Sequence, residues 1–212
     1  MGKEDTSVCV FRRVEKKYLL NTEQYLALLQ KIETFLVPDH YAKYTICNIY
    51  YDTDRYDLIR RSTEKPLYKE KLRLRSYGIP EPTDKAFIEI KKKYSGVVYK
   101  RRVKYTLEEA ERYLNTGEKP KNGGQILKEF DYFMNFYRPV PKLYLAYDRE
   151  AYSGAKDPSL RITFDRNIRS RESDLTLSAG DAGKLLLEKG TCLMEIKASF
   201  AYPLWLAKAL SE

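Results

Sequence analysis

Alternating apolar and polar positions run through most of this chain and predict a protein built mainly of β-strands. Residues 67–77 are the clearest case, because leucine alternates there with lysine or arginine. The short interval between 85–94 and 97–106 predicts a hairpin that turns at Ser95-Gly96. The same period of two, with many β-branched and aromatic residues, predicts strands at 8–20, 44–53, 67–77, 85–94, 97–106, 142–152, 160–166 and 191–199.

Five segments between or after these strands carry a helical spacing of apolar residues: 23–35, 107–114, 125–137, 179–189 and 204–210. Thr22 and Thr106 precede the first two segments and are candidate N-caps. In the first segment, Leu26, Leu29 and Ile32 are expected on one face. Because strands predominate, we predict an α+β fold that is mainly an antiparallel β-sheet decorated by helices.

The composition excludes several classes of protein. His40 is the only histidine, and Cys9, Cys47 and Cys192 are far apart, so neither a zinc site nor a disulfide framework is expected. We therefore expect a reducing, cytoplasmic environment. No apolar run reaches the ~18–20 residues of a membrane span, although a membrane partner is possible. The length of 212 residues is consistent with a single domain over residues 1–212.

Positive charge gathers on one face of most of the predicted strands. Lys and Arg number 39 against 30 Asp and Glu, which gives a net charge of +9. Side chains two residues apart on a strand share a face. Strand by strand, that rule groups Arg13, Glu15 and Lys17; Lys69, Lys71, Arg73 and Arg75; Glu89, Lys91 and Lys93; Lys100, Arg102 and Lys104; Arg161, Thr163 and Asp165; and Glu195 with Lys197.

These faces have two interpretations. They can be the solvated face of an antiparallel sheet, which is common. Such faces usually mix both charge signs, however, whereas these are strongly biased toward Lys and Arg. If helices cover the apolar faces, the cationic faces must meet across a barrel or a deep cleft.

A lumen lined by so many cations requires an anionic ligand. Two like charges ~6 Å apart at an effective dielectric of ~20 repel by roughly 3 kcal/mol, so many such pairs would destabilise an empty lumen. Arginine binds phosphate oxygens bidentately, which points to a phosphate-rich ligand. The interspersed carboxylates of Glu15, Glu89 and Glu195 suit a hard divalent cation that bridges substrate phosphates.

Seven segments carry a family resemblance: RRVEKKYLL (12–20), NIYYDT (48–53), KEKLRLRSYG (69–78), FIEIKKKYSGVVYKRRV (87–103), LYLAYDREAY (143–152), LRITFDRNI (160–168) and LMEIKAS (193–199). In this order they resemble the VTC domain, the catalytic domain of vacuolar transporter chaperone polyphosphate polymerases. That domain belongs to the triphosphate tunnel metalloenzyme (CYTH-like) superfamily. The resemblance implies an eight-stranded closed β-barrel tunnel with a basic interior.

The resemblance also implies roles for individual residues. The cations expected to act in catalysis are Lys17, Arg73, Arg75, Lys91, Lys100, Arg149 and Arg161. Further cations expected to bind substrate are Lys71, Lys93, Arg102 and Lys197. Glu195 matches the metal-binding glutamate of the family, and Glu89 and Glu15 are expected to join it in holding Mn²⁺ or Mg²⁺.

The sequence departs from the family pattern at two places. The wider superfamily has E-x-E-x-K on the first strand, but here the first position is Arg13, which favours the VTC branch over a two-metal hydrolytic site. The family continues beyond its last helix into a segment with Ser and Lys that completes the tunnel, whereas this chain stops at Glu212. The chain is therefore expected to be truncated or to lack that wall.

The expected function is a metal-dependent phosphotransferase of the polyphosphate polymerase type. It would move the terminal phosphoryl group of a nucleoside triphosphate onto inorganic polyphosphate. A triphosphate or tripolyphosphate hydrolase and a non-catalytic polyphosphate-binding module are the alternatives within the same site. A nucleic-acid binder, which the charge of +9 and the 19 tyrosines also suggest, would instead carry its cations on an outer face beside exposed aromatic residues. We expect no nucleic-acid partner.

Overall fold

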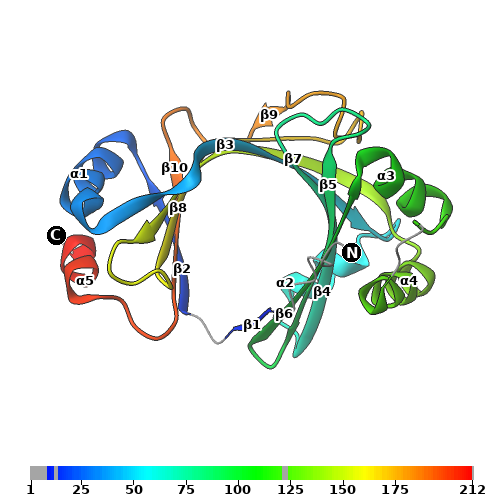
Figure 1. The fold of residues 1–212 in the computed structure, drawn as a ribbon, viewed down its shortest axis with the longest axis horizontal. Coiled ribbons are helices and arrows are strands. Elements are labelled where there is room, and N and C mark those ends of the chain that lie inside the picture. Colours follow the sequence, from blue (N-terminus) through cyan, green and yellow to red (C-terminus); the bar gives the residue numbers. More distant parts are fainter. Residues whose placement is uncertain (1–8, 12–13, 121–123, 212) are drawn as a thin grey trace, which may run out of the picture. The chain divides into compact units, whose positions relative to one another are not determined.

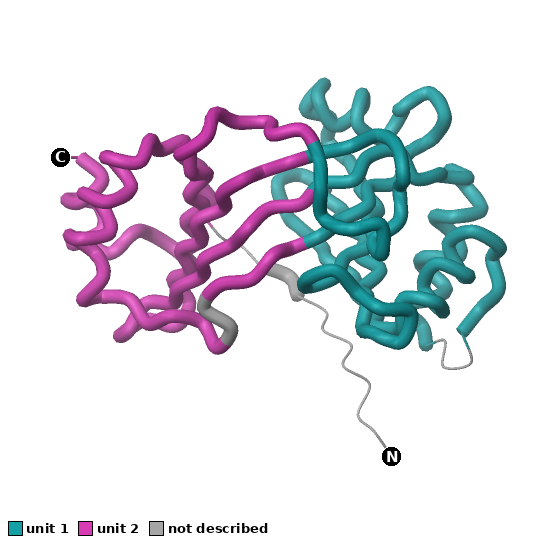
Figure 2. Tube along the Cα trace, turned by 90° about the horizontal axis from the view of Figure 1, so that it is seen from above, with its two compact units in different colours: residues 1–11, 47–145, 170–183 teal, residues 12–46, 146–169, 184–212 magenta. Residues whose placement is uncertain are grey.

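The computed structural model of the protein describes residues 9–11, 14–120 and 124–211. The described residues form two compact units (Figure 2). Unit 1 contains residues 9–11, 47–145 and 170–183, and unit 2 contains 14–46, 146–169 and 184–211. Each unit is assembled from distant parts of the chain. The single domain expected from the length remains a prediction.

Ten strands and five α-helices form the two units (Figure 1). The strands are β1 (Cys9–Phe11), β2 (Val14–Leu20), β3 (Leu36–Asp52), β4 (Tyr68–Tyr77), β5 (Lys85–Tyr94), β6 (Val97–Thr106), β7 (Val140–Gly154), β8 (Arg161–Arg171), β9 (Lys184–Leu185) and β10 (Cys192–Ala198). The helices are α1 (Thr22–Ile32), α2 (Asp57–Thr63), α3 (Leu107–Thr116), α4 (Gln125–Tyr137) and α5 (Leu204–Ser211), and a 3-10 turn (Glu33–Phe35) follows α1. The predicted α+β class is confirmed.

The strands follow the order β1-β6-β5-β4-β3-β7-β8-β10-β2, with β9 paired to β8. Among the described residues, β1 and β2 are the two ends of this order and do not pair with each other. The sheet is therefore not closed into a barrel by hydrogen bonds. The eight-stranded closed barrel that the resemblance implies is not confirmed.

The β5–β6 hairpin agrees with its predicted bounds and turn. Ser95 has φ 45° and Gly96 has φ 85°, so both central residues of the turn are left-handed. Two left-handed residues form the type of turn whose twist matches that of the flanking strands. The turn fixes the register of β5 against β6, and this register positions the charged side chains described below.

In unit 1, the helices cover the apolar face of β4 to β6. Leu72, Leu74, Ile88 and Ile90 are fully buried on that face. Helix α3 contacts β5 and β6, and α4 contacts β6 (Figure 1). Thr106 caps α3 as predicted, since its hydroxyl accepts a hydrogen bond from the Glu109 N–H. Alternation therefore places Arg73, Glu89 and Arg102 on the face opposite these helices.

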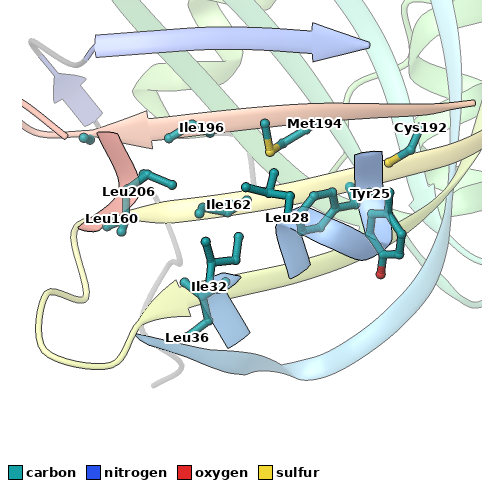
Figure 3. Close-up of a cluster of buried hydrophobic side chains, with 12 residues drawn as sticks. Tyr25, Leu28, Ile32, Leu36, Leu160, Ile162, Cys192, Met194, Ile196 and Leu206 are labelled. Carbon is teal, nitrogen blue, oxygen red and sulfur yellow. The ribbon is translucent and has the colours of Figure 1, made fainter. Parts of the chain in front are cut away.

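In unit 2, α1 and α5 pack over β8 and β10 (Figure 3). Helix α1 buries Tyr25, Leu28 and Ile32 in this core, whereas Leu26 is 57% exposed. Of the predicted face, Ile32 is buried and Leu29 packs against this core, so Leu26 is the residue that departs from the prediction. The N-cap also differs from the prediction: Asn21, and not Thr22, accepts a hydrogen bond from the Gln24 N–H.

Residues 179–189 do not form the predicted helix. The backbone of this segment forms turns and the short strand β9. Arg171 donates hydrogen bonds to the carbonyls of Gly180 and Ala182 in this segment, and to those of Asp174 and Thr176 before it. The half-buried Arg171, whose guanidinium lies over the ring of Tyr144, thus holds the segment.

Candidate functional site

The charged residues of β4, β5 and β6 lie in rows across one face of unit 1. We call Lys69, Lys71, Arg73, Arg75, Glu89, Lys91, Lys93, Lys100 and Arg102 the unit 1 cationic face. The strand register places Arg73, Glu89 and Arg102 in one row. Lys71, Lys91 and Lys100 form the next row, and Lys69 lies opposite Lys93 in the row after it. The grouping predicted from alternation is therefore present on these three strands.

Glu89 is the centre of the first row. Its carboxylate is 2% exposed and accepts hydrogen bonds from Arg73 Nε at 2.6 Å and Arg102 Nε at 2.5 Å. Lys100 Nζ lies 2.8 Å from the same carboxylate. One buried negative charge thus holds three cations from two neighbouring strands, in the arrangement that we call the Glu89 centre.

The Glu89 centre shifts the pKa values of its members in opposite directions. Burial raises the pKa of Glu89, but Arg73, Arg75 and the other cations outweigh burial and hold that pKa well below its usual range. Burial lowers the pKa of Lys100, and the repulsion from Arg102 and Arg73 adds to it. The pKa of Lys100 is about 8 even though Glu89 favours its charged form.

The arginines of this face also bind three side chains on β3 and β4 that the sequence analysis missed. The Tyr50 hydroxyl accepts a hydrogen bond from Arg73 at 3.3 Å, and the Asn48 side-chain oxygen accepts one from Arg75 Nε at 2.8 Å. Tyr77 accepts a hydrogen bond from Arg102 at 3.3 Å. Burial raises the pKa of Tyr50, but Arg73 and the neighbouring cations outweigh it and lower this pKa. The only available sequence signal was that Asn48 and Tyr50 share a face of their strand.

Unit 2 carries a second charged group on β2 and β10. Lys17 Nζ lies 3.2 Å from Glu195, and Lys197 Nζ lies 2.6 Å from it. Glu15 lies opposite Lys197 in the register and makes a side-chain hydrogen bond to Glu195. Burial raises the pKa of Glu195, but Glu15, Lys197 and Lys17 outweigh burial and hold this pKa well below its usual range.

Two more predicted catalytic arginines lie in unit 2, each with an acidic partner. Arg149 binds Asp165 through two parallel hydrogen bonds of 2.6 and 2.7 Å. Burial lowers the pKa of Arg149, but Asp165 outweighs burial and raises it. Arg161 of β8 lies 2.5 Å from Asp39 of β3. The alternation of residues within β8 could not indicate this partner on another strand. Asp165 and Asp39 are therefore further members of this charged group.

The candidate metal ligands differ in how well they fit a divalent cation. Both oxygens of Glu89 already bind cationic side chains, which leaves them poorly suited to a metal ion. Glu15 and Glu195 are two adjacent carboxyl groups, a donor set that suits Mg²⁺ when phosphate oxygens supply the remaining ligands. Within the part of the chain that the structure describes, no three His, Cys, Asp or Glu residues are grouped as a protein-only metal site.

The structure thus divides the predicted residues between the two units. Arg73, Arg75, Lys91 and Lys100 share a face of unit 1, together with the predicted substrate-binding residues Lys71, Lys93 and Arg102. Lys17, Lys197, Glu15 and Glu195 form one group in unit 2, where Arg149 and Arg161 also lie. That both groups act on one ligand remains a prediction.

Comparison with known protein families matches residues 12–212 to the VTC domain. This chain belongs to the VTC domain family. The resemblance carried by the seven sequence segments is thereby confirmed. A search of curated proteins finds no match to this VTC domain.

Solved structures are similar to this chain at low sequence identity. A candidate adenylate cyclase from Bacillus halodurans is 15% identical over 90% of this chain and 82% of its own, with a TM-score of 0.56. A candidate adenylyl cyclase from Hippeastrum with a dominant triphosphatase activity is 12% identical over 95% of this chain and 83% of its own, with a TM-score of 0.48. The first comparison shows a common fold.

Across residues 9–11, 14–120 and 124–211, we find no helix with the length and apolar character needed to cross a membrane. The cytoplasmic location expected from the sequence remains a prediction.

Proposed function

We propose that this VTC domain transfers the terminal phosphoryl group of a nucleoside triphosphate to the end of an inorganic polyphosphate chain. The observation that carries the proposal is the Glu89 centre, where a single carboxylate faces Arg73, Lys100 and Arg102. Three cations against one anion leave an excess of positive charge on a face that also carries Lys71 and Lys91. A chain of phosphates supplies the negative charge that this face lacks.

The residues of the site would act by positioning and by stabilising charge. In the transfer, the bond between the γ-phosphorus and its bridging oxygen breaks, and the nucleoside diphosphate leaves with the electron pair. A terminal oxygen of the polyphosphate forms the new bond to phosphorus. This reaction needs no protein nucleophile, because the acceptor oxygen is already ionised and phosphoryl transfer depends mainly on alignment and electrostatics.

The arginines and lysines would have different parts in this reaction. Arg73 and Arg102 present planar guanidinium groups that can bind two phosphate oxygens at once. Lys100 can neutralise charge that develops on the bridging oxygen, provided that it is protonated. In unit 2, Lys17, Arg149 and Arg161 would bind further phosphate groups.

A divalent cation would be held by Glu195 and Glu15, the pair that fits it best. When bound, Mn²⁺ or Mg²⁺ neutralises charge on the phosphate oxygens. Lys17 and Lys197, which bind Glu195 in the structure described here, would then be available to contact phosphate.

The deciding experiment incubates the protein with ATP, Mn²⁺ and a short polyphosphate primer, and follows ADP and chain length together. Release of ADP with growth of the chain supports transfer. Release of ADP with only orthophosphate as second product would replace transfer by hydrolysis. Binding of tripolyphosphate without ADP release would favour a non-catalytic binding module.

Matched variants connect the activity to the site. Arg102→Gln removes one guanidinium of the Glu89 centre and is expected to lower ADP release at least about 10-fold, because it deletes charge-assisted hydrogen bonds. Lys128→Gln makes the same change in net charge at an exposed position of α4 and is expected to leave the rate unchanged. Equal losses in both variants would show that the activity does not depend on this site.

A further inference from the structure

Helix α4 carries an exposed row of side chains on the face of unit 1 opposite the cationic face (Figure 1). Lys128, Tyr132 and Phe136 follow one another at intervals of four residues, so they lie along one side of the helix. Tyr132 is 66% exposed and Phe136 is 62% exposed, and their ring centroids are 5.7 Å apart in a stacked arrangement. Adjacent exposed apolar side chains of this size are typical of an interaction site.

Two tyrosines of the sheet extend this row. Tyr68 of β4 and Tyr94 of β5 lie opposite each other in the strand register and are 44% and 52% exposed. Tyr68 is joined to α4 through Glu70, because the hydroxyls of Tyr68 and Tyr137 both donate hydrogen bonds to this carboxylate. The ring of Tyr137 in turn packs edge-on against Phe136, with 4.8 Å between the centroids. We call Lys128, Tyr132, Phe136, Tyr68 and Tyr94 the α4 patch.

The aromatic rings of the α4 patch are held in place before any partner binds. Glu70 is only 7% exposed, and it accepts hydrogen bonds of 2.9 Å from Tyr68 and 2.7 Å from Tyr137. Rings that are already fixed lose little conformational entropy when a partner covers them. The α4 patch is therefore preorganised as a docking surface.

The charges of α4 restrict what can cover this surface. Both acidic residues of the helix already bind cations of the same chain: Glu129 binds Lys92 and Arg101, and Asp131 binds Lys119. Lys128 thus has no acidic partner to spare on its own helix. A complementary surface must present an aromatic ring or an acid to Lys128, and a cation or a ring to Phe136.

Helix α4 itself has this complementary pattern. Lys128 and Phe136 lie four residues to either side of Tyr132. If two copies of α4 pair antiparallel about a two-fold axis at Tyr132, the Lys128 of each copy lies opposite the Phe136 of the other. A lysine ammonium group over a phenylalanine ring is a favourable cation–π contact, and the symmetry forms it twice. The two Tyr132 rings meet at the axis, where they can stack.

We infer that the α4 patch is the contact surface between two copies of this chain, which form a symmetric dimer through antiparallel α4 helices. The inference does not depend on the proposed function, because the unit 1 cationic face lies on the opposite side of β4 to β6. Helix α4 has 13 residues and is about 20 Å long, so the contact is smaller than a standard interface of roughly 1,600 Å². We therefore expect a weak dimer with a Kd in the micromolar range.

The test measures the dimer fraction of the full chain by sedimentation velocity from about 1 to about 200 μM, a range that brackets a micromolar Kd. Phe136→Lys places two ammonium groups opposite each other and is expected to raise the Kd of the dimer at least about 10-fold. Lys128→Phe combined with Phe136→Lys exchanges the two positions, and the two-fold symmetry restores both cation–π contacts. This double variant should therefore dimerise nearly as well as wild type.

Phe200→Lys is the matched control, since it makes the same substitution at a position of unit 2 that is 89% exposed. It should dimerise like wild type. ADP release from ATP is measured on the same samples and should be equal in all four proteins, so a failure of the proposed function is recognised separately.

Three results would overturn the inference. They are a wild type that stays monomeric over the whole range, a dimer that Phe136→Lys leaves intact, and a loss in Phe136→Lys that the exchange of positions does not restore. A monomer that binds vesicles of phosphatidylcholine and phosphatidylserine, and loses this binding in Phe136→Lys but not in Phe200→Lys, would assign the α4 patch to a lipid surface and would also overturn it.

Discussion

At the scale of single residues, Glu89 carries a negative charge in a position where Arg73, Lys100 and Arg102 would otherwise repel one another. We predict that Glu89→Gln lowers the free energy of unfolding by about 3 kcal/mol at pH 7, because it leaves partly buried cations without their counter-charge. The folded-state pKa of Glu89 lies below its unfolded value of 4.5, so its contribution is present above that value and is lost as the pH falls. Chemical denaturation at pH 7 and at lower pH measures both effects.

Glu108→Gln is the control for this prediction. Glu108 is exposed on α3, and its carboxylate forms an ion pair with Arg112 of the same helix. Its removal is expected to cost at most about 0.5 kcal/mol. If Glu89→Gln costs no more than the control, Glu89 does not organise the three cations.

Lys100 makes phosphate binding dependent on pH. Its pKa of about 8 lies below the usual value of 10.5, and a bound phosphate would raise it again. Binding then takes up a proton above pH 8, so affinity for tripolyphosphate is predicted to be constant below pH 8 and to fall above it, by up to about 10-fold per pH unit. Calorimetry from about pH 7 to about pH 9.5, a range that includes the pKa of Lys100, measures the affinity for tripolyphosphate as a function of pH.

Lys100→Arg separates the charge of this residue from its titration. Arginine stays protonated throughout this pH range, so the variant should bind tripolyphosphate with an affinity that changes little above pH 8. A variant profile that falls as steeply as that of wild type would assign the pH dependence to another group.

Tyr50 positions Arg73 through its hydroxyl group. We predict that Tyr50→Phe weakens tripolyphosphate binding about 2- to 10-fold, the range that corresponds to loss of one hydrogen bond, and raises KM more than it lowers kcat. Tyr132→Phe removes a hydroxyl from an exposed position of α4 and should change neither quantity. A fall in thermal stability of Tyr50→Phe at unchanged affinity would give Tyr50 a structural role only.

At the scale of elements, substitutions on two sides of α1 show which side of this helix stabilises unit 2. Ile32 is fully buried in one cluster with residues of β8 and β10 (Figure 3). Leu26 is 57% exposed. Ile32→Ala is predicted to lower the free energy of unfolding by about 2–5 kcal/mol, because it removes buried methyl groups and leaves a cavity. Leu26→Ala, on the same helix, is expected to cost less than about 1 kcal/mol. Comparable losses in the two variants in urea would contradict the packing described here.

The same helix shows the limit of periodicity as a predictor. Leu26 fits the helical spacing as well as Tyr25 and Leu28 do, and only the position of α1 over the strands decides which of these residues is buried. The faces of the strands were easier to predict. Successive residues of a strand point to only two faces, and most charged side chains lie on one of them. Most cations of the candidate site were therefore found from the sequence.

Other features depend on contacts between distant residues. The segment 179–189 was predicted as a helix, and the donors of Arg171 that hold the carbonyls preceding β9 have no signature in that segment. Tyr50 was missed because an aromatic residue in a strand is ordinarily a packing residue, and its hydroxyl gains its role only from Arg73 on β4. Asp165 and Asp39 were missed as partners of arginines for the same reason.

At the scale of the whole molecule, closure of the sheet was the least predictable property. Strand β1 pairs with β6, and strand β2 pairs with β10. The two N-terminal strands are therefore the first and the last strand of the sheet. Residues 12–13, which join them, lie outside the described residues, as does Arg13, the position that departs from the superfamily pattern. Alternation within one strand carries no information on the partner of that strand, and closure depends on those partners alone.

The net charge of +9 does not by itself distinguish a phosphate chain from a nucleic acid, but the placement of the charge does. On the helix-covered side of unit 1, Lys92 and Arg101 share the carboxylate of Glu129, and the exposed stacked pair Tyr132 and Phe136 lies on α4. The cations in excess lie on the opposite face. A nucleic-acid surface would require aromatic rings free to stack on bases beside the excess charge, whereas the exposed Tyr77 beside Arg102 accepts a hydrogen bond from it and packs edge-on against Phe87.

We therefore predict a selective effect of tripolyphosphate on the stability of the full chain. At a concentration 100-fold above its Kd, a ligand that binds only the folded state adds about 2.7 kcal/mol, which raises Tm by about 5–10 °C for a chain of this length. Equimolar sulfate has the charge of a single phosphate group and cannot span several rows of cations, so it should raise Tm far less. An RNA oligonucleotide should fail to displace tripolyphosphate at 0.15 M salt, because non-specific binding to a basic surface weakens steeply with ionic strength. The prediction is contradicted if RNA displaces tripolyphosphate at that salt concentration and if sulfate and tripolyphosphate raise Tm equally. The positive charge would then bind anions in general, and the rows of cations on β4 to β6 would have no preference for a chain of phosphates.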